Sequence, residues 1–179
     1  MKAKPTIIAI IGASGSGKTY MSKLLQSEFG LFLIVSYTTR AMREGEIEGV
    51  DHFYIRDARH ISRKDMLSYT KFAGREYFAL ESQLAPNILN AYVVDEKGLK
   101  FLKENKAHKF NIISIRIESE PGTLVRRGID ELRILRDKDR ELLPLDYYDY
   151  VVDNNGTIEE FENNIRKTYK EIEKWQHQK

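Results

Sequence analysis

The chain contains no cysteine, which excludes a disulfide scaffold, a thiol nucleophile and a cysteine-bound zinc site. It also lacks a long apolar run: the one near the N-terminus, residues 6–11, is too short for a signal peptide or a membrane span. There is little excess charge, because 29 lysines and arginines face 27 aspartates and glutamates. We therefore expect a cytoplasmic protein that binds neither nucleic acid nor membranes.

Apolar segments of two kinds alternate along the chain, which is 179 residues long and 41% hydrophobic. Short runs predict buried strands over residues 6–11, 31–35, 92–95, 110–117 and 150–152. Longer segments with helical spacing predict helices over residues 20–29 and 96–105, and a last helix that begins near Thr157 with Glu160 completing a capping box. The fold class we expect is α/β, with a parallel sheet flanked by helices. One face of the last helix should be core, and its residues are Ile158, Phe161, Ile165, Tyr169 and Ile172.

A glycine-rich octapeptide follows the first predicted strand and precedes the first predicted helix. It satisfies the P-loop pattern, and its residues are Gly12, Ala13, Ser14, Gly15, Ser16, Gly17, Lys18 and Thr19. Backbone N–H groups at such a turn converge on phosphate oxygens, and the helix dipole adds positive charge. We expect these residues and Tyr20 to bind ATP, with Lys18 on the β- and γ-phosphates and the Thr19 hydroxyl as a ligand of Mg²⁺.

Two long stretches interrupt the alternation. Residues 36–89 hold short strands and many aromatic residues, which indicates an inserted subdomain. Residues 118–144 are rich in charges of both signs and poor in apolar residues, which indicates a lid that stays open until ligands bind. The remaining residues, 1–35 and 90–179, would form the P-loop core.

Two arginines lie three residues apart just after the second predicted strand. Ligands of open α/β sheets bind beyond the carboxyl ends of strands, so Arg40 and Arg43 could hold a phosphate there. A P-loop alone indicates only that a nucleoside triphosphate binds. The arginine pair beside it, which could hold a second phosphate, indicates phosphoryl transfer.

The sequence resembles the guanylate kinase family at several places. They are Val35-Ser36-Tyr37-Thr38-Thr39-Arg40 with Arg43, Gly45-Glu46, Gly49-Val50-Asp51-His52-Phe53-Tyr54, Phe72-Ala73-Gly74 with Tyr77, and Tyr148-Asp149-Tyr150-Val151-Val152-Asp153-Asn154. The resemblance spans most of the chain. It implies a P-loop kinase core, a monophosphate-binding insert and a short arginine-bearing lid. It also implies transfer of the γ-phosphoryl of ATP, with Mg²⁺, to a nucleoside monophosphate such as GMP.

The resemblance assigns roles to several residues. Ser36, Arg40, Arg43 and Tyr77 match positions that hold the acceptor phosphate, Asp95 matches an acidic position near the acceptor and the metal, and Asn154 matches a position near the adenine of ATP. The lid arginines that would act in catalysis are, in order of preference, Arg136, Arg133 and Arg127.

Four positions depart from the family pattern. Ser68 stands where the family has a guanine-reading glutamate, Ala79 where it has a hydroxyl, His52 where it has a tyrosine, and Val93 where it has an aspartate. A carboxylate accepts from both guanine donors at once, so selection for GMP should be weaker here. Alternatively, Asp65, Glu76 or Glu81 supplies the missing carboxylate. We keep His52 and Ser68 among the acceptor-binding candidates.

Three other functions stay open at this point. The chain could phosphorylate another phosphorylated metabolite, such as a ribose bisphosphate, or it could be a non-catalytic guanylate-kinase-like interaction module. An intact triphosphate cradle argues against the module. A nucleotide-driven switch or motor would need a partner domain, for which 179 residues leave no room. A monomer and a homodimer are both compatible with the sequence.

Overall fold

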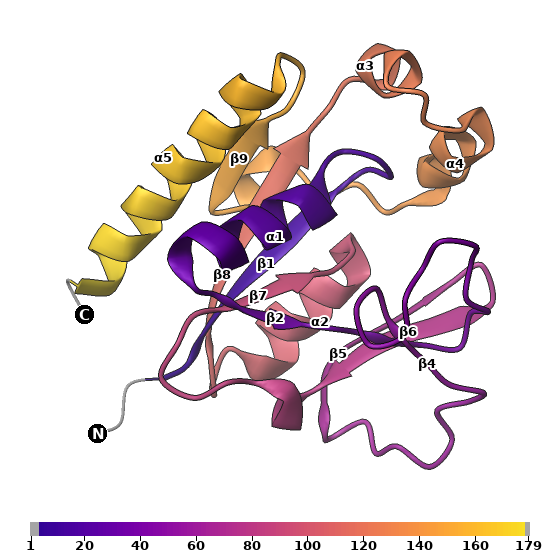
Figure 1. Cartoon of the computed structure of the whole chain (residues 1–179). Helices are drawn as coiled ribbons and strands as arrows, with labels where there is room; N and C mark the ends of the chain where they lie inside the picture. The colour runs from indigo at the N-terminus through magenta and orange to yellow at the C-terminus, as the bar shows by residue number, and fades with distance from the viewer. Residues whose placement is uncertain (1–3, 178–179) are drawn as a thin grey trace.

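The chain forms two sheets, one in the core and one in the inserted stretch (Figure 1). The computed structural model describes residues 4–177, and the side chains of Arg136, Asp139 and His177 lie outside that description. The core sheet has the order β2-β7-β1-β8-β9, and every neighbouring pair is parallel. Its strands are β1 (Thr6–Gly12), β2 (Phe32–Ile34), β7 (Asn90–Val93), β8 (Asn111–Glu118) and β9 (Tyr150–Asp153). The expected α/β class is confirmed.

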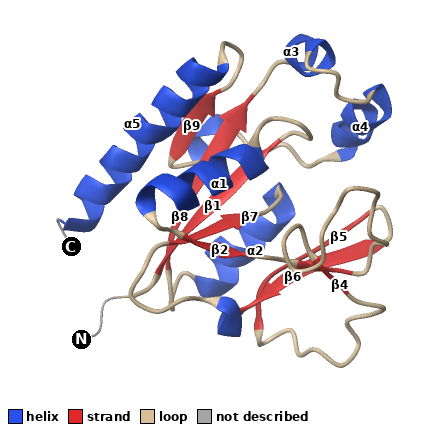
Figure 2. Cartoon of the chain, in the orientation of Figure 1, coloured by secondary structure: helices blue, strands red, loops and turns tan. Residues whose placement is uncertain are grey.

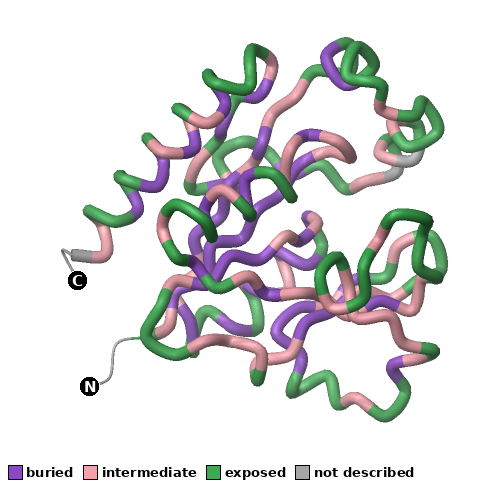
Figure 3. Tube along the Cα trace, viewed as in Figure 1, coloured by how far each residue is buried: buried purple, intermediate pink, exposed green. Residues whose placement is uncertain are grey.

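Helices cover both faces of this sheet (Figure 2). On one face, α1 (Lys18–Phe29) and α5 (Ile158–His177) share an apolar cluster with Ile8 and Ile10 of β1. On the other, α2 (Glu96–Lys106) packs Leu99 and Leu102 against Ile7 and Ile11. Alternate residues of β1 therefore enter opposite clusters, which explains its uninterrupted apolar sequence. All of β1 is buried, as the tube through the centre of the molecule shows (Figure 3).

The last helix begins where its sequence predicts. The Thr157 hydroxyl accepts from the Glu160 backbone N–H at 3.2 Å, and the Glu160 carboxylate accepts from the Thr157 backbone N–H at 2.7 Å. This reciprocal pair is the expected capping box. The assignment of Ile158 to the core face is wrong, because this residue is 57% exposed in the first turn of α5.

The second sheet has the order β4-β3-β6-β5. Its strands are β3 (Tyr37–Thr38), β4 (Phe53–Tyr54), β5 (Met66–Phe72) and β6 (Arg75–Leu80), and a short helix η1 (Glu81–Gln83) follows. Ala73 and Gly74 join β5 to β6, and both have positive φ, as tight hairpin turns require. Leu67 and Ala79 belong to the same cluster as Leu99 of α2, so the two sheets share a core.

The charged stretch forms short helices beside the P-loop rather than a sheet. They are α3 (Pro121–Arg126), α4 (Glu131–Arg136) and η2 (Asp137–Asp139), and η3 (Leu145–Tyr147) follows just after the stretch. Figure 1 places α3 and α4 at the end of the core sheet where the loop after β1 lies. This segment, residues 118–144, is called the lid below.

Candidate functional site

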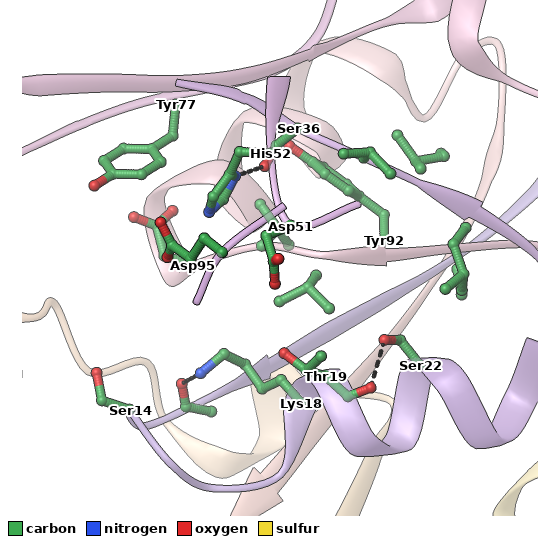
Figure 4. Close-up of a pocket in the computed structure, with 18 of the residues that line it drawn as sticks. Ser14, Lys18, Thr19, Ser22, Ser36, Asp51, His52, Tyr77, Tyr92 and Asp95 are labelled. Atoms are coloured by element: carbon green, nitrogen blue, oxygen red, sulfur yellow. Dashed lines mark hydrogen bonds between the residues drawn. The ribbon is translucent and has the colours of Figure 1, made fainter. Parts of the chain in front are cut away.

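A cavity of about 630 Å³ lies beyond the carboxyl ends of β1, β2 and β7. The P-loop lines one side of it, and residues of the second sheet and its loops line the other (Figure 4). Arg133, Asp137 and Arg140 of the lid also line it. Three segments that are distant in sequence therefore meet at one site, at the edge of the sheet where α/β proteins bind ligands.

The P-loop holds the Lys18 ammonium near the N-terminus of α1. Its Nζ donates to the carbonyl oxygens of Gly12 at 2.9 Å and Ala13 at 2.7 Å. Burial, and secondarily the Arg140 guanidinium, lowers the pKa of Lys18 to about 8. A cation held in this way is strongly attracted to a phosphate, which would restore its charged form.

Two residues behind the P-loop fix its shape. The Asn154 Nδ2 donates to the Ser16 carbonyl at 2.8 Å. Gly17 has φ 101°, and a Cβ there would lie 2.8 Å from Asn154 and 2.9 Å from the Phe161 ring. Only glycine fits at this position, both for its φ and for its contacts.

This packing shows how two sequence-predicted residues are held. Asn154 is buried behind the loop, where it supports the Ser16 carbonyl, and it is not among the residues that line the cavity. Arg127 donates to the Asn154 Oδ1 and to the Gly156 carbonyl, each at 3.1 Å, and it is also absent from the cavity lining. The ends of β9 and α3 therefore bring these two side chains together beside the P-loop.

The other ATP-binding candidates divide between the two sides of the loop. Gly12, Ser14, Gly15, Gly17, Thr19 and Tyr20 line the cavity with Lys18, whereas Ala13 and Ser16 do not. The Ser16 hydroxyl is buried and has no hydrogen-bond partner within the described part of the chain. The Tyr20 hydroxyl donates to the Glu162 carboxylate, which ties α1 to α5.

On the opposite side of the cavity, Arg40 is held in a fixed orientation. Its guanidinium donates two hydrogen bonds of 2.8 Å to the Glu46 carboxylate, which also accepts from the Tyr54 hydroxyl at 2.7 Å and the Arg43 N–H at 2.8 Å. The bonds from Arg40 lower the pKa of Glu46 to about 2. The Arg43 side chain is 52% exposed at the same rim. Two guanidinium groups thus flank one end of the cavity, as the sequence spacing suggested.

Ser36, His52 and Tyr77 lie close together on the same side of the cavity, opposite the P-loop (Figure 4). The Ser36 Oγ and the His52 Nδ1 are 2.8 Å apart, and the His52 ring meets the Tyr77 ring edge-on, with centroids 6.0 Å apart. Burial and the nearby Arg40 lower the pKa of His52 below its usual value, so the neutral imidazole is favoured.

Ser68 is paired with a residue that the sequence did not single out. Its Oγ lies 2.5 Å from the Tyr92 hydroxyl, and both residues line the cavity. Asp95 also lines it, where its carboxylate accepts from the Thr70 hydroxyl at 3.0 Å and from the Gly98 N–H at 2.8 Å. Tyr92 and Thr70 belong to no sequence motif. Only a prediction that their side chains point from a strand into the cavity could have identified them as site residues.

None of the three alternative carboxylates reaches this cavity. Glu76 accepts from the Tyr69 hydroxyl at 2.8 Å, and Glu81 pairs with Lys106 and Lys109. Asp65 lines a separate hollow with Glu81. None of these three therefore takes the place of the missing glutamate beside Ser68, and the acidic residues that do line the cavity are Glu46, Asp51, Asp95 and Asp137.

The lid contacts the core at several points, which the expectation of an open lid did not foresee. Asp137 accepts from the Ser14 backbone N–H of the P-loop and, at 3.1 Å, from the Ser14 hydroxyl. Arg140 donates to both oxygens of Glu96, a buried residue of α2, at 2.6 and 3.1 Å. The segment also has an apolar anchor, because Leu143 is buried in the cluster that contains Leu99 of α2.

The structure describes the side chains of two of the three lid arginines expected from the sequence, and it adds Arg140. Arg133 lines the cavity, whereas the side chain of Arg136 lies outside the described residues. Arg140 also lines the cavity, and its interaction lowers the pKa of Lys18, so the structure brings it closer to the phosphate site than Arg127. Its partner Glu96 directly follows Asp95, which is the only sequence signal that could have found the pair.

Comparison with known proteins matches this arrangement. A model of the guanylate kinase family matches residues 3–174. The chain belongs to the guanylate kinase family. A guanylate kinase of Fusobacterium nucleatum is 30% identical over 163 residues, covering 83% of this chain and 88% of that protein. One of Protochlamydia amoebophila is 28% identical over 176 residues, covering 89% and 87%.

A solved structure also resembles it. The crystal structure of guanylate kinase from Anaplasma phagocytophilum superposes with a TM-score of 0.68 at 25% identity, covering 95% of this chain and 87% of that one. Within residues 4–177, no helix of this guanylate kinase family member is long and apolar enough to span a membrane. The same residues contain no cluster of three or more histidine, cysteine or acidic side chains that could hold a metal ion.

The lowered pKa of Lys18 predicts how ADP binding depends on pH. The lysine loses its charge as the pH rises through about 8, and a bound diphosphate attracts only the charged form. The dissociation constant for ADP should therefore increase at least about tenfold from about pH 7 to about pH 9.5. Titration calorimetry can measure it, and Lys18→Met should bind weakly with no such rise. A flat wild-type profile would contradict the assigned pKa.

The Asp137 contact predicts competition between the lid and nucleotide phosphates. Its carboxylate occupies hydrogen-bond donors of the P-loop that an anionic ligand would use. Asp137→Ala should lower the dissociation constant for ADP in metal-free buffer by about tenfold, which corresponds to the free energy of one charge-assisted hydrogen bond. Glu131→Ala removes the same charge from an exposed lid position and should have little effect. Weaker ADP binding by Asp137→Ala would show that the carboxylate assists binding instead.

Proposed function

We propose that this protein transfers the γ-phosphoryl group of ATP to a nucleoside monophosphate, of which GMP is one candidate. The observation that carries the proposal is that one cavity has an intact P-loop on one side and an arginine pair on the other. A triphosphate on the P-loop would direct its γ-phosphoryl toward a monophosphate held by Arg40 and Arg43. Reacting groups held in this way need little further reorganisation.

Each residue acts through position and charge. Lys18 offsets the negative charge that develops on the moving phosphoryl group, and Arg133 and Arg140 add positive charge from the lid. Arg136 stays a proposed third member of this group, on the sequence alone. Glu46 keeps the Arg40 guanidinium oriented before an acceptor arrives. No general base is needed, because a phosphate acceptor is already anionic at neutral pH.

The remaining candidates surround the acceptor. Ser36 and His52 form a hydrogen-bonded pair beside Arg40, and Tyr77 packs against the His52 ring, so all three suit contacts with phosphate or ribose oxygens. Asp95 lies between this region and the P-loop, where its carboxylate is held by Thr70.

The site also suits magnesium bound together with ATP. Mg²⁺ usually takes one or two protein ligands and completes its shell with phosphate oxygens and water. Thr19 lines the cavity next to Lys18, and its hydroxyl would supply the protein ligand. The metal would neutralise part of the phosphate charge during transfer.

An ADP-release assay tests the proposed activity. The purified protein is given Mg²⁺ and ATP with GMP, AMP, CMP, UMP or a ribose bisphosphate, and a reaction without acceptor measures idle hydrolysis. At least one monophosphate should give turnover well above that background, and Lys18→Ala should lower kcat/KM by about 100-fold or more. Turnover with the ribose bisphosphate alone would favour the metabolite kinase. ATP binding without turnover on any acceptor would favour a non-catalytic module.

The arginine pair predicts separate effects on the two substrates. Arg40→Ala should raise the KM of the acceptor by about 10- to 150-fold, since one charge-assisted contact contributes about 1.5–3 kcal/mol. The KM of ATP should change little, because Arg40 lies on the opposite side of the cavity from the P-loop. Arg59→Ala is a matched control, since the Arg59 side chain is 78% exposed in the same stretch and its one ion pair within residues 4–177 is with Asp57. An equal rise in both KM values would refute the assignment.

A further inference from the structure

A pair of buried hydroxyl groups closes the cavity between the two sheets. The Ser68 Oγ of β5 and the Tyr92 Oη of β7 are 2.5 Å apart, and the two residues are 1% and 2% exposed. Burial raises the pKa of Tyr92, so the pair is uncharged at neutral pH. The hydrogen bond joins the second sheet to the core sheet at a buried part of the cavity wall.

The polar groups around this pair are also satisfied within the protein. Thr70 donates to Asp95, whose second carboxylate oxygen accepts from the Gly98 N–H. Ser36 is paired with His52. Ala79, which lies opposite Ser68 in the β5–β6 ladder, has no polar side-chain atom. Both oxygens of Asp95 therefore already accept hydrogen bonds, and Asp51, which also lines the cavity, accepts from the Ile47 N–H at 2.8 Å.

Strong selection among bases usually depends on buried groups that only one base can satisfy. A site built to hydrogen-bond one substrate rejects its analogues by about 10⁴-fold or more, because its polar groups would then stay unpaired. A site without such groups discriminates mainly by shape, which amounts to about 10- to 200-fold for a difference of one methylene group. Ser68 and Tyr92 satisfy each other, so a mismatched base leaves neither of them unpaired.

A hydroxyl pair is also tolerant when it contacts a base directly. Each hydroxyl can donate or accept, and the pair together can present one donor beside one acceptor. The pairing edge of every common base has an adjacent donor and acceptor. A carboxylate accepts only, which is why it distinguishes the two adjacent donors of guanine.

We propose that the Ser68–Tyr92 pair makes this a base-tolerant site, which selects acceptors by their phosphate and takes purine and pyrimidine nucleoside monophosphates alike. The inference rests on the proposed phosphoryl transfer and names the substrate class of that site. GMP is then one acceptor among several.

The wild-type protein provides the first test. Steady-state kinetics with GMP, AMP, CMP and UMP should give kcat/KM values that lie within about 200-fold of one another. A wider spread, with one base preferred, would overturn base tolerance while leaving the kinase activity established. Failure of all four acceptors, in protein that binds ADP normally, would instead remove the proposed function itself.

A substitution tests whether the pair is responsible. Ser68→Glu adds a carboxylate with no partner at this end of the cavity, and it should raise the ratio of kcat/KM for GMP to that for AMP at least about tenfold. Ser82→Glu adds the same charge at an exposed serine of η1 and should leave the ratio unchanged. An unchanged ratio in Ser68→Glu protein that still binds ADP would overturn the role of the pair. If that variant does not bind ADP, the wild-type spread decides the question.

Discussion

A buried positive charge at the end of the central strand is the constraint on which the rest of the site depends. Lys18 begins α1 directly beyond β1, which is buried along its whole length, and its ammonium is held by two backbone carbonyls. A cation removed from water needs compensation, and the shifted pKa of Lys18 reflects that cost. The loop that places it is in turn supported by Asn154 and Phe161 from the last strand and helix.

Two other cations of the cavity are each paired with a carboxylate. Arg40 is bound by Glu46, and Arg140 by Glu96, while Asp137 is bound by the P-loop itself. Such pairing keeps long side chains in fixed orientations and limits the repulsion that several like charges would otherwise cause in one cavity. An anionic substrate would therefore enter a site whose positive groups are already oriented.

The phosphate end and the base end of the cavity differ in chemical character. Charged groups dominate around Lys18, Arg40 and Arg43, whereas hydroxyls, apolar side chains and the hydrogen-bonded carboxylate of Asp95 surround Ser68 and Tyr92. Phosphate recognition thus keeps the family pattern at most of its positions, while base recognition departs from it. This division is why family membership alone does not identify the acceptor.

The sequence by itself determined the elements and the phosphate chemistry. Strand and helix periodicity placed the core strands within a few residues, the capping box located the start of α5, and the P-loop pattern depends on local backbone geometry that eight consecutive residues specify. Only the tertiary structure decided which side chains share the cavity. Asn154 and Arg127 contact each other beside the P-loop, and Arg140 lines the cavity. Tyr92 of the core sheet forms a hydrogen bond with Ser68 of the second sheet. These outcomes depend on how separate segments pack, because side-chain direction and long-range pairing leave no local periodic signal in the chain.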